Sequence, residues 1–461
     1  METKELKEKL FMARPNVYDD LSEEARAEMN DFSAKYMRFI DIAKTEREAV
    51  IEGIKMLEEA GFKSFEFGDK IEKGGKYYYN NRGKALIAFA IGSENVEKGI
   101  RISVAHVDSP RIDLKQCPVY EDGNMGFFKT HYYGGIKKYQ WTAIPLALHG
   151  VVYRADGSVV DVCIGEDEND PVFYINDLLP HLAKNQMGKT LAEGITGEGL
   201  NILIGSEPYS DKDADQRIKL HMLKLLNEKY GITEADFLSA ELTCVPADKA
   251  REIGFDRSLI GGYGHDDRVC AYPALRALLD HPNPEHTLMT ILADKEEIGS
   301  NGNTGMECII FVDIITEIAN ALGANERLVR RNSKCLSADV NAAYDPNFAE
   351  VYERNNSSFI NRGVVLTKYT GSRGKGGTSD ASAEFVGFVR SIFDREGVIW
   401  QSGELGKVDQ GGGGTVAMYV AEKDIDVVDL GVPVISMHAP WEVIAKADLY
   451  MTYKAFSVFN K

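Results

Sequence analysis

Hydrophobic positions recur with a helical period near the start of the chain. Between residues 45 and 61, the apolar side chains that share one helical face are Ala49, Val50, Ile54 and Leu57. Thr45 and Glu48 stand at the spacing of a capping box, and Gly61 stands where a helix would end. The pattern predicts a helix between Thr45 and Gly61.

Short apolar runs elsewhere predict strands. These runs cover residues 77–79, 86–91, 100–104, 287–292, 334–337 and 432–437, and a turn at residues 80–83 separates the first two. From Asp248 onward the runs alternate with helical patterns, and each run ends in a cluster of polar residues. Such alternation is typical of an α/β sandwich whose sheet is largely buried.

The stretch from residue 111 to residue 245 differs in composition from the rest of the chain. It is richer in aromatic and β-branched residues, as at Phe127-Phe128, than the sequence on either side. We interpret residues 111–245 as a β-rich insertion between two parts of one larger α/β domain. Those two parts are residues 1–110 and 246–461, which also contain the polar clusters described below.

The charge composition of the chain limits the kinds of molecule that it can bind. The chain has 461 residues, of which 53 are basic and 71 acidic, and its formal net charge is −18. A surface this acidic repels phosphate backbones and anionic lipids, so we expect no nucleic-acid partner and no membrane partner. The amino terminus is charged where a signal peptide needs an apolar run, and no apolar stretch is long enough to span a bilayer. We therefore expect a soluble, cytoplasmic protein.

The six cysteines are scattered along the chain, at Cys117, Cys163, Cys244, Cys270, Cys308 and Cys335. Disulfide scaffolds and thiolate zinc sites both need cysteines in close pairs or clusters. We therefore expect reduced thiols. Any metal ion must then be held by histidine and carboxylate side chains.

Five clusters of polar residues follow predicted strands or lie in adjacent turns. They are residues 106–108 (His-Val-Asp), 265–268 (His-Asp-Asp-Arg), 294–297 (Asp-Lys-Glu-Glu), 337–339 (Ser-Ala-Asp) and 437–440 (Met-His-Ala-Pro). Taken singly, each cluster is more often a hydrogen-bonded turn or a solvated helix start than part of an active site. Ligand sites form where the strands of an α/β sheet end, and several carboxylates gathered there would repel one another without cations. The clusters together favour a site for two divalent metal ions.

The same motifs carry a resemblance to a known family. The matching stretches are residues 105–115, 264–278, 292–300, 336–346 and 429–461, and the last opens with Asp429-Leu430-Gly431-Val432-Pro433-Val434-Ile435-Ser436-Met437-His438. Over nearly its full length the chain resembles the aspartyl aminopeptidase family of dinuclear zinc metallopeptidases (metallopeptidase family 18), which includes vacuolar leucine-preferring aminopeptidases. The resemblance implies a three-layer α/β/α metallopeptidase domain with a mainly parallel mixed sheet. A β-rich dimerisation or lid domain at residues 111–245 would interrupt it.

The resemblance also implies a set of metal ligands. Asp266 matches the carboxylate that bridges the two ions. His106 and Asp339 would complete the ligands of one ion, and Glu297 and His438 those of the other. The implied ions are two zinc ions per chain, with cobalt or manganese as alternatives, because imidazole and carboxylate ligands suit all three.

Two further residues match catalytic positions of the family. Glu296 stands at the position of the general base, and Asp108 at that of the residue that holds and polarises His106. General chemistry agrees, because a metal-bound histidine usually donates its second ring N–H to a carboxylate, which fixes its tautomer. The implied activity is an aminopeptidase that removes N-terminal residues from peptides. Glu296 would carry a proton from the attacking water to the leaving amine.

The substrate pocket matches the family less closely. Family members place a histidine of a neighbouring subunit beside the metals, and here His181 is present, but Asn185 stands where the next histidine is expected. His181 is either that residue or a structural one. Lys375 stands one position off register from the lysine of members that select acidic residues. It is either a carboxylate-binding residue or a solvated cation in a glycine-rich loop, so the preferred N-terminal residue stays open. The glycines at 411–414 indicate either a close backbone approach near the pocket or a plain tight loop.

Two other readings stay open beside the aminopeptidase. Carboxypeptidases and N-acyl amino acid deacylases share the His-x-Asp and Glu-Glu motifs, but they generally lack the closing segment. A non-catalytic, metal-stabilised shell is the third reading, and the presence of Glu296 together with all five candidate ligands argues against it. The resemblance further implies a homo-oligomer, namely a tetrahedral dodecamer built from dimers, with active sites that face an inner chamber.

Overall fold

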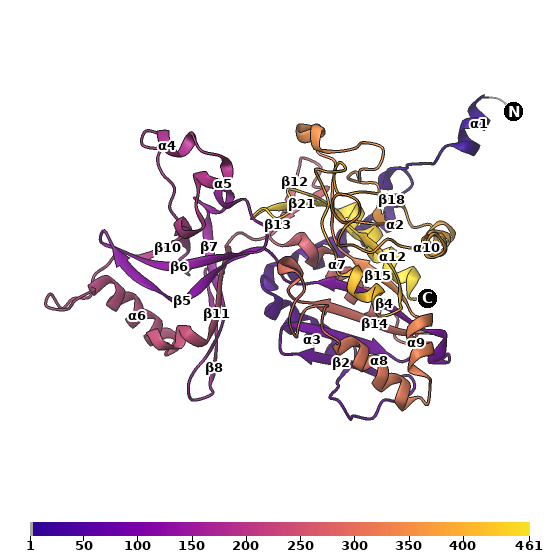
Figure 1. Cartoon of the computed structure of the whole chain (residues 1–461), viewed down its shortest axis with the longest axis horizontal. Coiled ribbons are helices and arrows are strands. Elements are labelled where there is room, and N and C mark those ends of the chain that lie inside the picture. The colour runs from indigo at the N-terminus through magenta and orange to yellow at the C-terminus, as the bar shows by residue number, and fades with distance from the viewer. Residues whose placement is uncertain (1–2) are drawn as a thin grey trace.

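A nine-stranded sheet forms the centre of the larger part of the molecule (Figure 1), in a computed structural model that describes residues 3–461. Its strands lie in the order β1 (Lys63–Ser64), β2 (Lys76–Asn81), β3 (Ala85–Ala90), β14 (Thr287–Ala293), β4 (Ile100–His106), β15 (Lys334–Ala338), β19 (Asp426–Gly431), β17 (Val364–Thr367) and β18 (Trp400–Ser402). β14, β4, β15 and β19 are parallel neighbours, whereas β3 is antiparallel to both its neighbours and β17 is antiparallel to β19. The expected mixed, mainly parallel sheet is confirmed.

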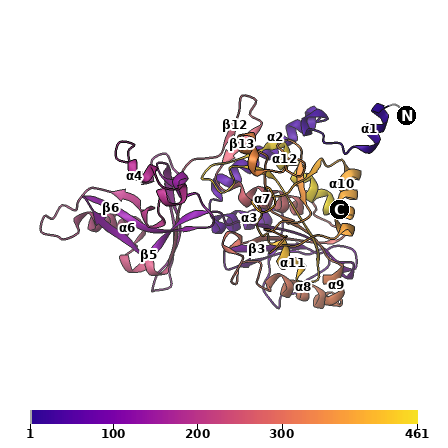
Figure 2. The same ribbon diagram turned by 45° about the horizontal axis from the view of Figure 1, so that its top comes forward.

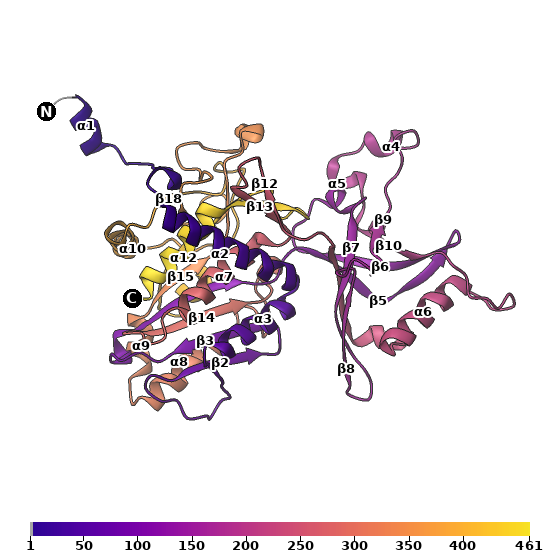
Figure 3. The same cartoon turned by 180° about the vertical axis from the view of Figure 1, so that it is seen from behind.

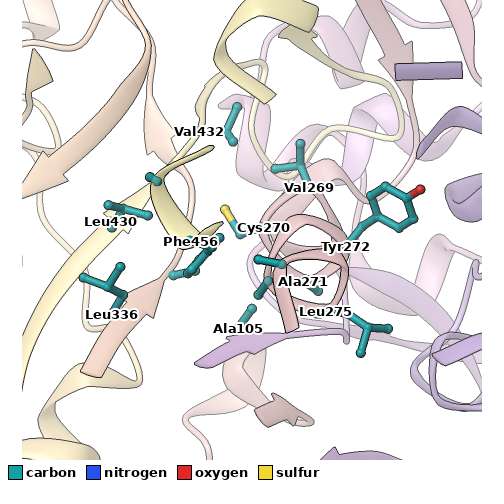
Figure 4. Packing of buried hydrophobic residues seen from close by; sticks show 14 of the residues in the cluster. Ala105, Val269, Cys270, Ala271, Tyr272, Leu275, Leu336, Leu430, Val432 and Phe456 are labelled. Carbon is teal, nitrogen blue, oxygen red and sulfur yellow. The ribbon is translucent and has the colours of Figure 1, made fainter. Parts of the chain in front are cut away.

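Helices cover both faces of this sheet, which makes the predicted three layers (Figures 1 and 3). One face carries α2 (Glu23–Ile42), α3 (Glu46–Glu59), α7 (His265–Leu279), α10 (Ala383–Glu396) and α12 (Lys446–Phe459). The other carries α8 (Ile310–Ala321), α9 (Glu326–Asn332) and α11 (Ala417–Ala421). Figure 4 shows the first interface, where Leu336 and Leu430 of the sheet face Cys270 of α7 and Phe456 of α12. Burial of this apolar surface is the main force that holds the layers together.

The helix predicted between Thr45 and Gly61 is present as α3. Thr45 is its N-cap, and the side chains of Thr45 and Glu48 each accept the backbone N–H of the other residue. Ala49, Val50 and Leu57 are buried against the sheet. The capping box and the apolar stripe therefore predicted this element within one residue at its start.

Residues 111–246 form a second sheet that stands apart from the first (Figures 1 and 2). Its seven strands lie in the order β11 (Ala240–Pro246), β5 (Arg111–Asp122), β6 (Met125–Tyr133), β10 (Ile202–Gly205), β9 (Phe173–Ile175), β7 (Pro145–Tyr153) and β8 (Val159–Ile164), and β11 also pairs with β7. This sheet has its own apolar core, on which α6 (Arg217–Tyr230) packs. The short helices α4 (Lys184–Met187) and α5 (Leu191–Gly194) also belong to this part.

A third, small sheet lies beside the carboxyl ends of the main strands. Its strands are β12 (Arg251–Ile253), β13 (Leu259–Gly262), β21 (Glu442–Ala445), β20 (Pro433–Ile435) and β16 (Asn341–Ala342). The strand predicted over residues 432–437 is present but shorter, as β20, and it belongs to this small sheet rather than to the main one. Gly431 passes so close to Asp339 that a Cβ atom would meet the Asp339 carbonyl oxygen at 1.8 Å. The chain turns from one sheet to the other at this contact.

The first described helix, α1 (Thr3–Leu10), projects from the body and buries none of its residues (Figure 3). No helix within residues 3–461 is long and apolar enough to cross a membrane.

Candidate metal centre

The predicted site residues come from strand ends that the sheet order places side by side. His106 is the last residue of β4, Asp339 follows β15, and Glu296 and Glu297 lie in the single turn after β14. β14, β4 and β15 are parallel neighbours, so their carboxyl ends meet at one edge of the sheet. Asp266, at the start of α7, lies at the same edge.

The Asp266 carboxylate lies between two imidazoles and directs one oxygen to each. The distance from His106 Nε2 to Asp266 Oδ1 is 3.2 Å, and that from His438 Nε2 to Asp266 Oδ2 is 3.3 Å. Asp339 Oδ1 lies 3.9 Å from His106 Nε2, and Glu297 Oε2 lies 3.6 Å from His438 Nε2. The five residues thus form two groups, one around each histidine, that share Asp266.

Several buried polar atoms of this cluster have no hydrogen-bond partner. They are His106 Nε2, Asp266 Oδ1 and Glu297 Oε1. Buried polar groups are normally paired, so atoms left unpaired at one point indicate a ligand. Two sets of three ligand atoms, His106 with Asp266 and Glu297 and His106 with Glu296 and Asp339, each lie within 4.8 Å of one another. Imidazole nitrogen and carboxylate oxygen are the ligands that zinc uses without cysteine, so the residues fit zinc.

Asp108 holds one half of the site in position. The side-chain oxygens of Asp108 accept the backbone N–H groups of Glu296 at 3.1 Å and Glu297 at 3.2 Å, and the hydroxyl of Tyr133 at 2.8 Å. His106 Nδ1 lies 3.0 Å from the backbone oxygen of Asp108 and 3.3 Å from its carboxylate. These contacts leave His106 Nε2 free to face the cluster, as a metal ligand requires.

Glu442 holds the other half of the site, and no sequence motif points to this residue. Its carboxylate is buried and accepts the backbone N–H groups of His438 at 2.7 Å and Asp266 at 3.1 Å. His438 Nδ1 donates to the carbonyl of Gly135 at 2.7 Å, which turns His438 Nε2 toward Asp266. Ser109 donates to the carbonyl of Asp266 at 2.6 Å. All these side chains form hydrogen bonds with backbone atoms, so no pattern of residue types in the sequence reveals them.

The crowded carboxylates raise one another's affinity for protons. Burial and the charge of Asp339 raise the pKa of Glu296 to about 8, and burial with the charge of Asp266 raises the pKa of Glu297 well above its ordinary value. Burial disfavours a charged His438, but its hydrogen bond to Asp266 and the charge of Glu297 outweigh burial and raise its pKa to about 10. The site therefore draws positive charge to itself, as protons or as metal ions.

The cluster opens into a cavity of about 380 Å³. Its lining includes Asp266, Glu296, Glu297, Asp339, His438, Asn341, Thr367, Leu405, Thr415 and Asp429. Gly412, Gly413 and Gly414 form part of its wall, and a Cβ atom on Gly412 would meet the carbonyl oxygen of Gly371 at 1.9 Å. The predicted close approach of this glycine loop to the pocket is therefore confirmed.

Two predicted substrate-binding residues lie outside this lining. Lys375 donates to Asp380 at 2.8 Å, and its Nζ atom lies 3.8 Å from the centre of the Tyr369 ring. His181 is exposed and precedes α4 in the second sheet's part of the chain. The roles of Lys375 and His181 stay predictions.

Comparisons with known proteins find relatives that match nearly the whole chain. A family model described as aminopeptidase I zinc metalloprotease (M18) matches residues 39–460. The probable M18 family aminopeptidase 1 of Clostridium acetobutylicum is 49% identical over 452 residues, which is 96% of this chain and 97% of the relative. Its counterpart in Thermotoga maritima is 46% identical over 452 residues, 96% of this chain and 98% of the relative.

Solved structures show the same likeness over the whole chain. The crystal structure of the Thermotoga maritima M18 aminopeptidase has a TM-score of 0.93 and 46% identity, and the match covers 98% of this chain and 100% of that one. Aminopeptidase I from Clostridium acetobutylicum has a TM-score of 0.92 and 47% identity, with the same coverage. With its histidine and carboxylate cluster at the strand ends, this chain belongs to the M18 family of zinc metalloproteases, the aminopeptidases of the aminopeptidase I type.

Proposed function

We propose that the protein removes N-terminal residues from peptides and that the site would hold two zinc ions per chain, with Asp266 as a ligand shared by both groups of residues. The observation that carries this proposal is the Asp266 carboxylate, which directs one oxygen to His106 and the other to His438. Asp339 completes the first group of ligands and Glu297 the second, with Asp108 holding His106. Zinc, when bound, supplies a Lewis acid that polarises the peptide carbonyl and lowers the pKa of water.

Glu296 is the proposed general base. It is adjacent to the ligand Glu297 in the chain, its Oε2 lies 3.9 Å from His106 Nε2, and its side chain lines the cavity. Glu296 accepts a proton from the attacking water and delivers it to the leaving amine. Its raised pKa in the crowded site suits a group that must both take and release a proton near neutral pH.

The test is Glu296→Gln, which keeps the size of the side chain and removes its basicity. We expect zinc content to stay at the wild-type level while turnover of aminoacyl p-nitroanilides falls by about 10²–10⁴-fold. Glu307→Gln, at an exposed glutamate of the neighbouring loop, is the matched control and retains full turnover. Near-normal turnover by Glu296→Gln removes Glu296 from the mechanism.

The same assay separates the alternative activities. An aminopeptidase hydrolyses substrates with a free amino terminus and leaves N-acylated amino acids and peptides with blocked amino termini intact. Release of the acyl group would instead identify a deacylase, and cleavage at the carboxyl end of a blocked peptide would identify a carboxypeptidase. Zinc-loaded protein that turns over none of these substrates would support the non-catalytic shell.

We propose that residues 1–110 and 246–461 are the catalytic domain and that residues 111–245 are an inserted dimerisation or lid domain. Around His181 this segment exposes a row of large apolar side chains, at Leu178, Leu179, Leu182, Met187 and Leu191. Such a patch marks a protein contact. One structure with the same fold is that of the yeast mApe1 dodecamer, at 22% identity and a TM-score of 0.76.

We therefore propose a tetrahedral homododecamer, in which His181 enters the active site of a neighbouring subunit. Light scattering after size exclusion is expected to give the mass of twelve chains, and a monomer would overturn the assembly.

We also propose a cytoplasmic location, because the six cysteines are unpaired in the part of the chain that the structure describes. Fractionation of cells followed by immunoblotting tests the location.

A further inference from the structure

Three consecutive residues at the end of β6, Tyr133, Gly134 and Gly135, lie against both halves of the metal centre. β6 belongs to the seven-stranded sheet and runs toward the nine-stranded part of the molecule (Figure 1). The five candidate metal ligands, by contrast, all come from residues 1–110 and 246–461. The second sheet therefore contributes contacts to the site but no candidate metal ligand.

The Tyr133 hydroxyl reaches the half of the site that contains His106. It donates to Asp108 Oδ2 at 2.8 Å, and the Asp108 carboxylate also accepts the backbone N–H groups of Glu296 and Glu297. A hydroxyl that donates to a charged oxygen forms one of the stronger hydrogen bonds in a protein. This bond therefore fixes the carboxylate that orients the turn with the proposed base and one candidate ligand.

The ring of Tyr133 is itself held in place. The Arg111 guanidinium lies 4.0 Å from the centre of the Tyr133 ring, and it donates to Glu46 at 2.9 Å. Arg111 and Tyr133 are directly paired residues of β5 and β6. Glu46 is buried and belongs to α3 of the nine-stranded part. The ring and the hydroxyl of Tyr133 are thus each tied to the larger part of the molecule.

The two glycines bring the backbone of the same segment close to the other half of the site. The Gly135 carbonyl oxygen accepts a hydrogen bond from His438 Nδ1 at 2.7 Å. A Cβ atom on Gly134 would lie 3.3 Å from Glu297 Oε2 and 3.4 Å from Glu297 Cβ. Gly134 also has a φ of +75°, in the left-handed region that favours glycine. The segment therefore leaves little room for a side chain beside Glu297.

We propose that residues 133–135 position the metal ligands, so that metal binding depends on the inserted part of the same chain. Tyr133 is a positioning residue that acts through Asp108 on the turn of Glu296 and Glu297. Gly135 positions His438. All of these contacts lie within one chain, so this role is separate from any contact between subunits. The inference rests on the proposed function, in which these side chains hold zinc.

The first test is Tyr133→Phe, which removes the hydroxyl and keeps the ring beside Arg111. We expect the affinity for zinc, measured by competition with a chromogenic chelator, to fall by roughly 10–100-fold, which is typical when a partner of a metal ligand is changed. With zinc in excess, kcat on aminoacyl p-nitroanilides should fall while KM stays near the wild-type value, because the base is displaced and the substrate pocket is not. Tyr132→Phe, at the exposed tyrosine one position earlier in β6, is the matched control.

A double-mutant cycle shows whether Tyr133 acts through Asp108. If it does, Tyr133→Phe should lower zinc affinity much less in the Asp108→Asn background than in the wild type. Two independent effects would instead multiply. The cycle therefore separates a positioning role from a general loss of packing.

Gly134→Ala tests the close approach of the backbone. The added methyl group would meet Glu297, so this variant should also bind zinc more weakly. The control is Gly123→Ala, in the turn at the other end of β6, where φ is +54° and a Cβ atom would meet only Met125 Cε within 4 Å. Both changes place alanine at a positive φ, but only one lies at the site. Light scattering should give the wild-type mass for every variant.

Each outcome supports or overturns the proposal. A zinc affinity of folded Tyr133→Phe equal to that of Tyr132→Phe overturns it, and so do losses that multiply in the cycle. A loss of zinc that appears only together with a loss of assembly assigns the effect to subunit contacts and also overturns it. Where Gly134→Ala does not fold, Tyr133→Phe and the cycle decide the result. A wild type that binds zinc but hydrolyses no aminoacyl substrate counts against the proposed function alone, because the affinities still test residues 133–135.

Discussion

The metal centre and a second cluster around His149 both hold a buried imidazole against carboxylates. His149, in β7, lies between Glu48 of α3, at 2.7 Å from Nδ1, and Glu166, at 3.0 Å from Nε2. Lys44 Nζ lies 2.7 Å from the same Glu166 oxygen and donates to the carbonyl of Pro246 at 2.8 Å. This junction cluster (Lys44, Glu48, His149 and Glu166) joins the nine-stranded part of the molecule to residues 111–246.

Raised histidine pKa values do not distinguish the two clusters. Burial opposes a charged His149, but its hydrogen bonds to Cys163, Glu166 and Glu48 outweigh burial and raise its pKa to about 11, beside about 10 for His438. The difference lies in the balance of charge. In the junction cluster a protonated imidazole and a lysine offset two carboxylates, and both ring nitrogens of His149 are bonded.

In the metal centre the carboxylates outnumber the imidazoles, and His106 Nε2, Asp266 Oδ1 and Glu297 Oε1 are left unpaired. The same residue types thus make a closed ion-pair cluster in one place and an incomplete site in the other. Unpaired buried atoms, rather than residue types, indicate where a metal ion belongs.

The largest expected effect is loss of metal at the metal centre. Treatment with a zinc chelator should reduce aminopeptidase turnover to background and lower the melting temperature, because ions that bind only the folded state stabilise it. Added zinc should restore both. Asp266→Asn should lose both ions, as measured by elemental analysis, whereas a variant that keeps two ions per chain would contradict the bridging role. His149→Gln, the counterpart in the junction cluster, should keep its full zinc content.

The next effect is on stability. His149→Gln leaves Glu48 and Glu166 without their shared cation in a site where His149 is 2% exposed. We expect the free energy of unfolding to fall by about 3 kcal/mol, since breaking a buried ion pair is strongly destabilising. Urea unfolding measures the change, and His131→Gln, at an exposed histidine, serves as control. A loss as small as that of the control would show that the junction cluster contributes nothing to stability.

The stabilisation by His149 should depend on pH with a definite sign. Its folded pKa of about 11 lies above the ordinary value of 6.5, so its contribution is complete below pH 6.5. The contribution decreases as pH rises and is lost above about pH 11. The difference in unfolding free energy between wild type and His149→Gln should therefore narrow from pH 6.5 to pH 10. A difference that stays constant over this range would mean that His149 is neutral in the folded protein.

A smaller effect is expected at Asp108, which orients the metal centre. Asp108→Asn keeps the shape of the side chain but places an amide where Asp108 now accepts from Glu296, Glu297 and Tyr133. We expect a loss of roughly 10–100-fold in zinc affinity or turnover, which is typical when a partner of a metal ligand is changed. Competition with a chromogenic chelator measures the affinity. Asp113→Asn, at a carboxylate on the neighbouring strand that pairs with Arg111, is the control.

Much of the fold and the gathering of the site residues could be predicted because both follow from local rules. The capping box at Thr45 and Glu48 determined where α3 begins. Parallel neighbouring strands must end at the same edge, so a histidine at the end of β4 and carboxylates after β14 and β15 had to meet there.

The rest depends on contacts that leave no trace in the pattern of residue types. Glu442 accepts from backbone N–H groups, and Gly135 acts through its backbone carbonyl oxygen. The junction cluster was missed for a different reason. The capping box explains Glu48 without any partner outside its own helix, whereas His149 and Glu166 lie in the segment whose pairing with the first part could not be predicted.

The smallest effect is expected from a change at Cys163. This change tests whether charge balance or residue type determines which of the two clusters binds a metal ion. Glu48, His149 and Cys163 offer three ligand atoms within 4.8 Å of one another, which by residue type alone resembles a zinc site. If the balanced charges of the junction cluster leave no need for a metal ion, Cys163→Ser should leave the zinc content unchanged. It should alter the free energy of unfolding by less than about 0.5 kcal/mol, because Cys163 is exposed. Elemental analysis that finds a third ion in the wild type, absent from Cys163→Ser, would show that residue type outweighs charge balance.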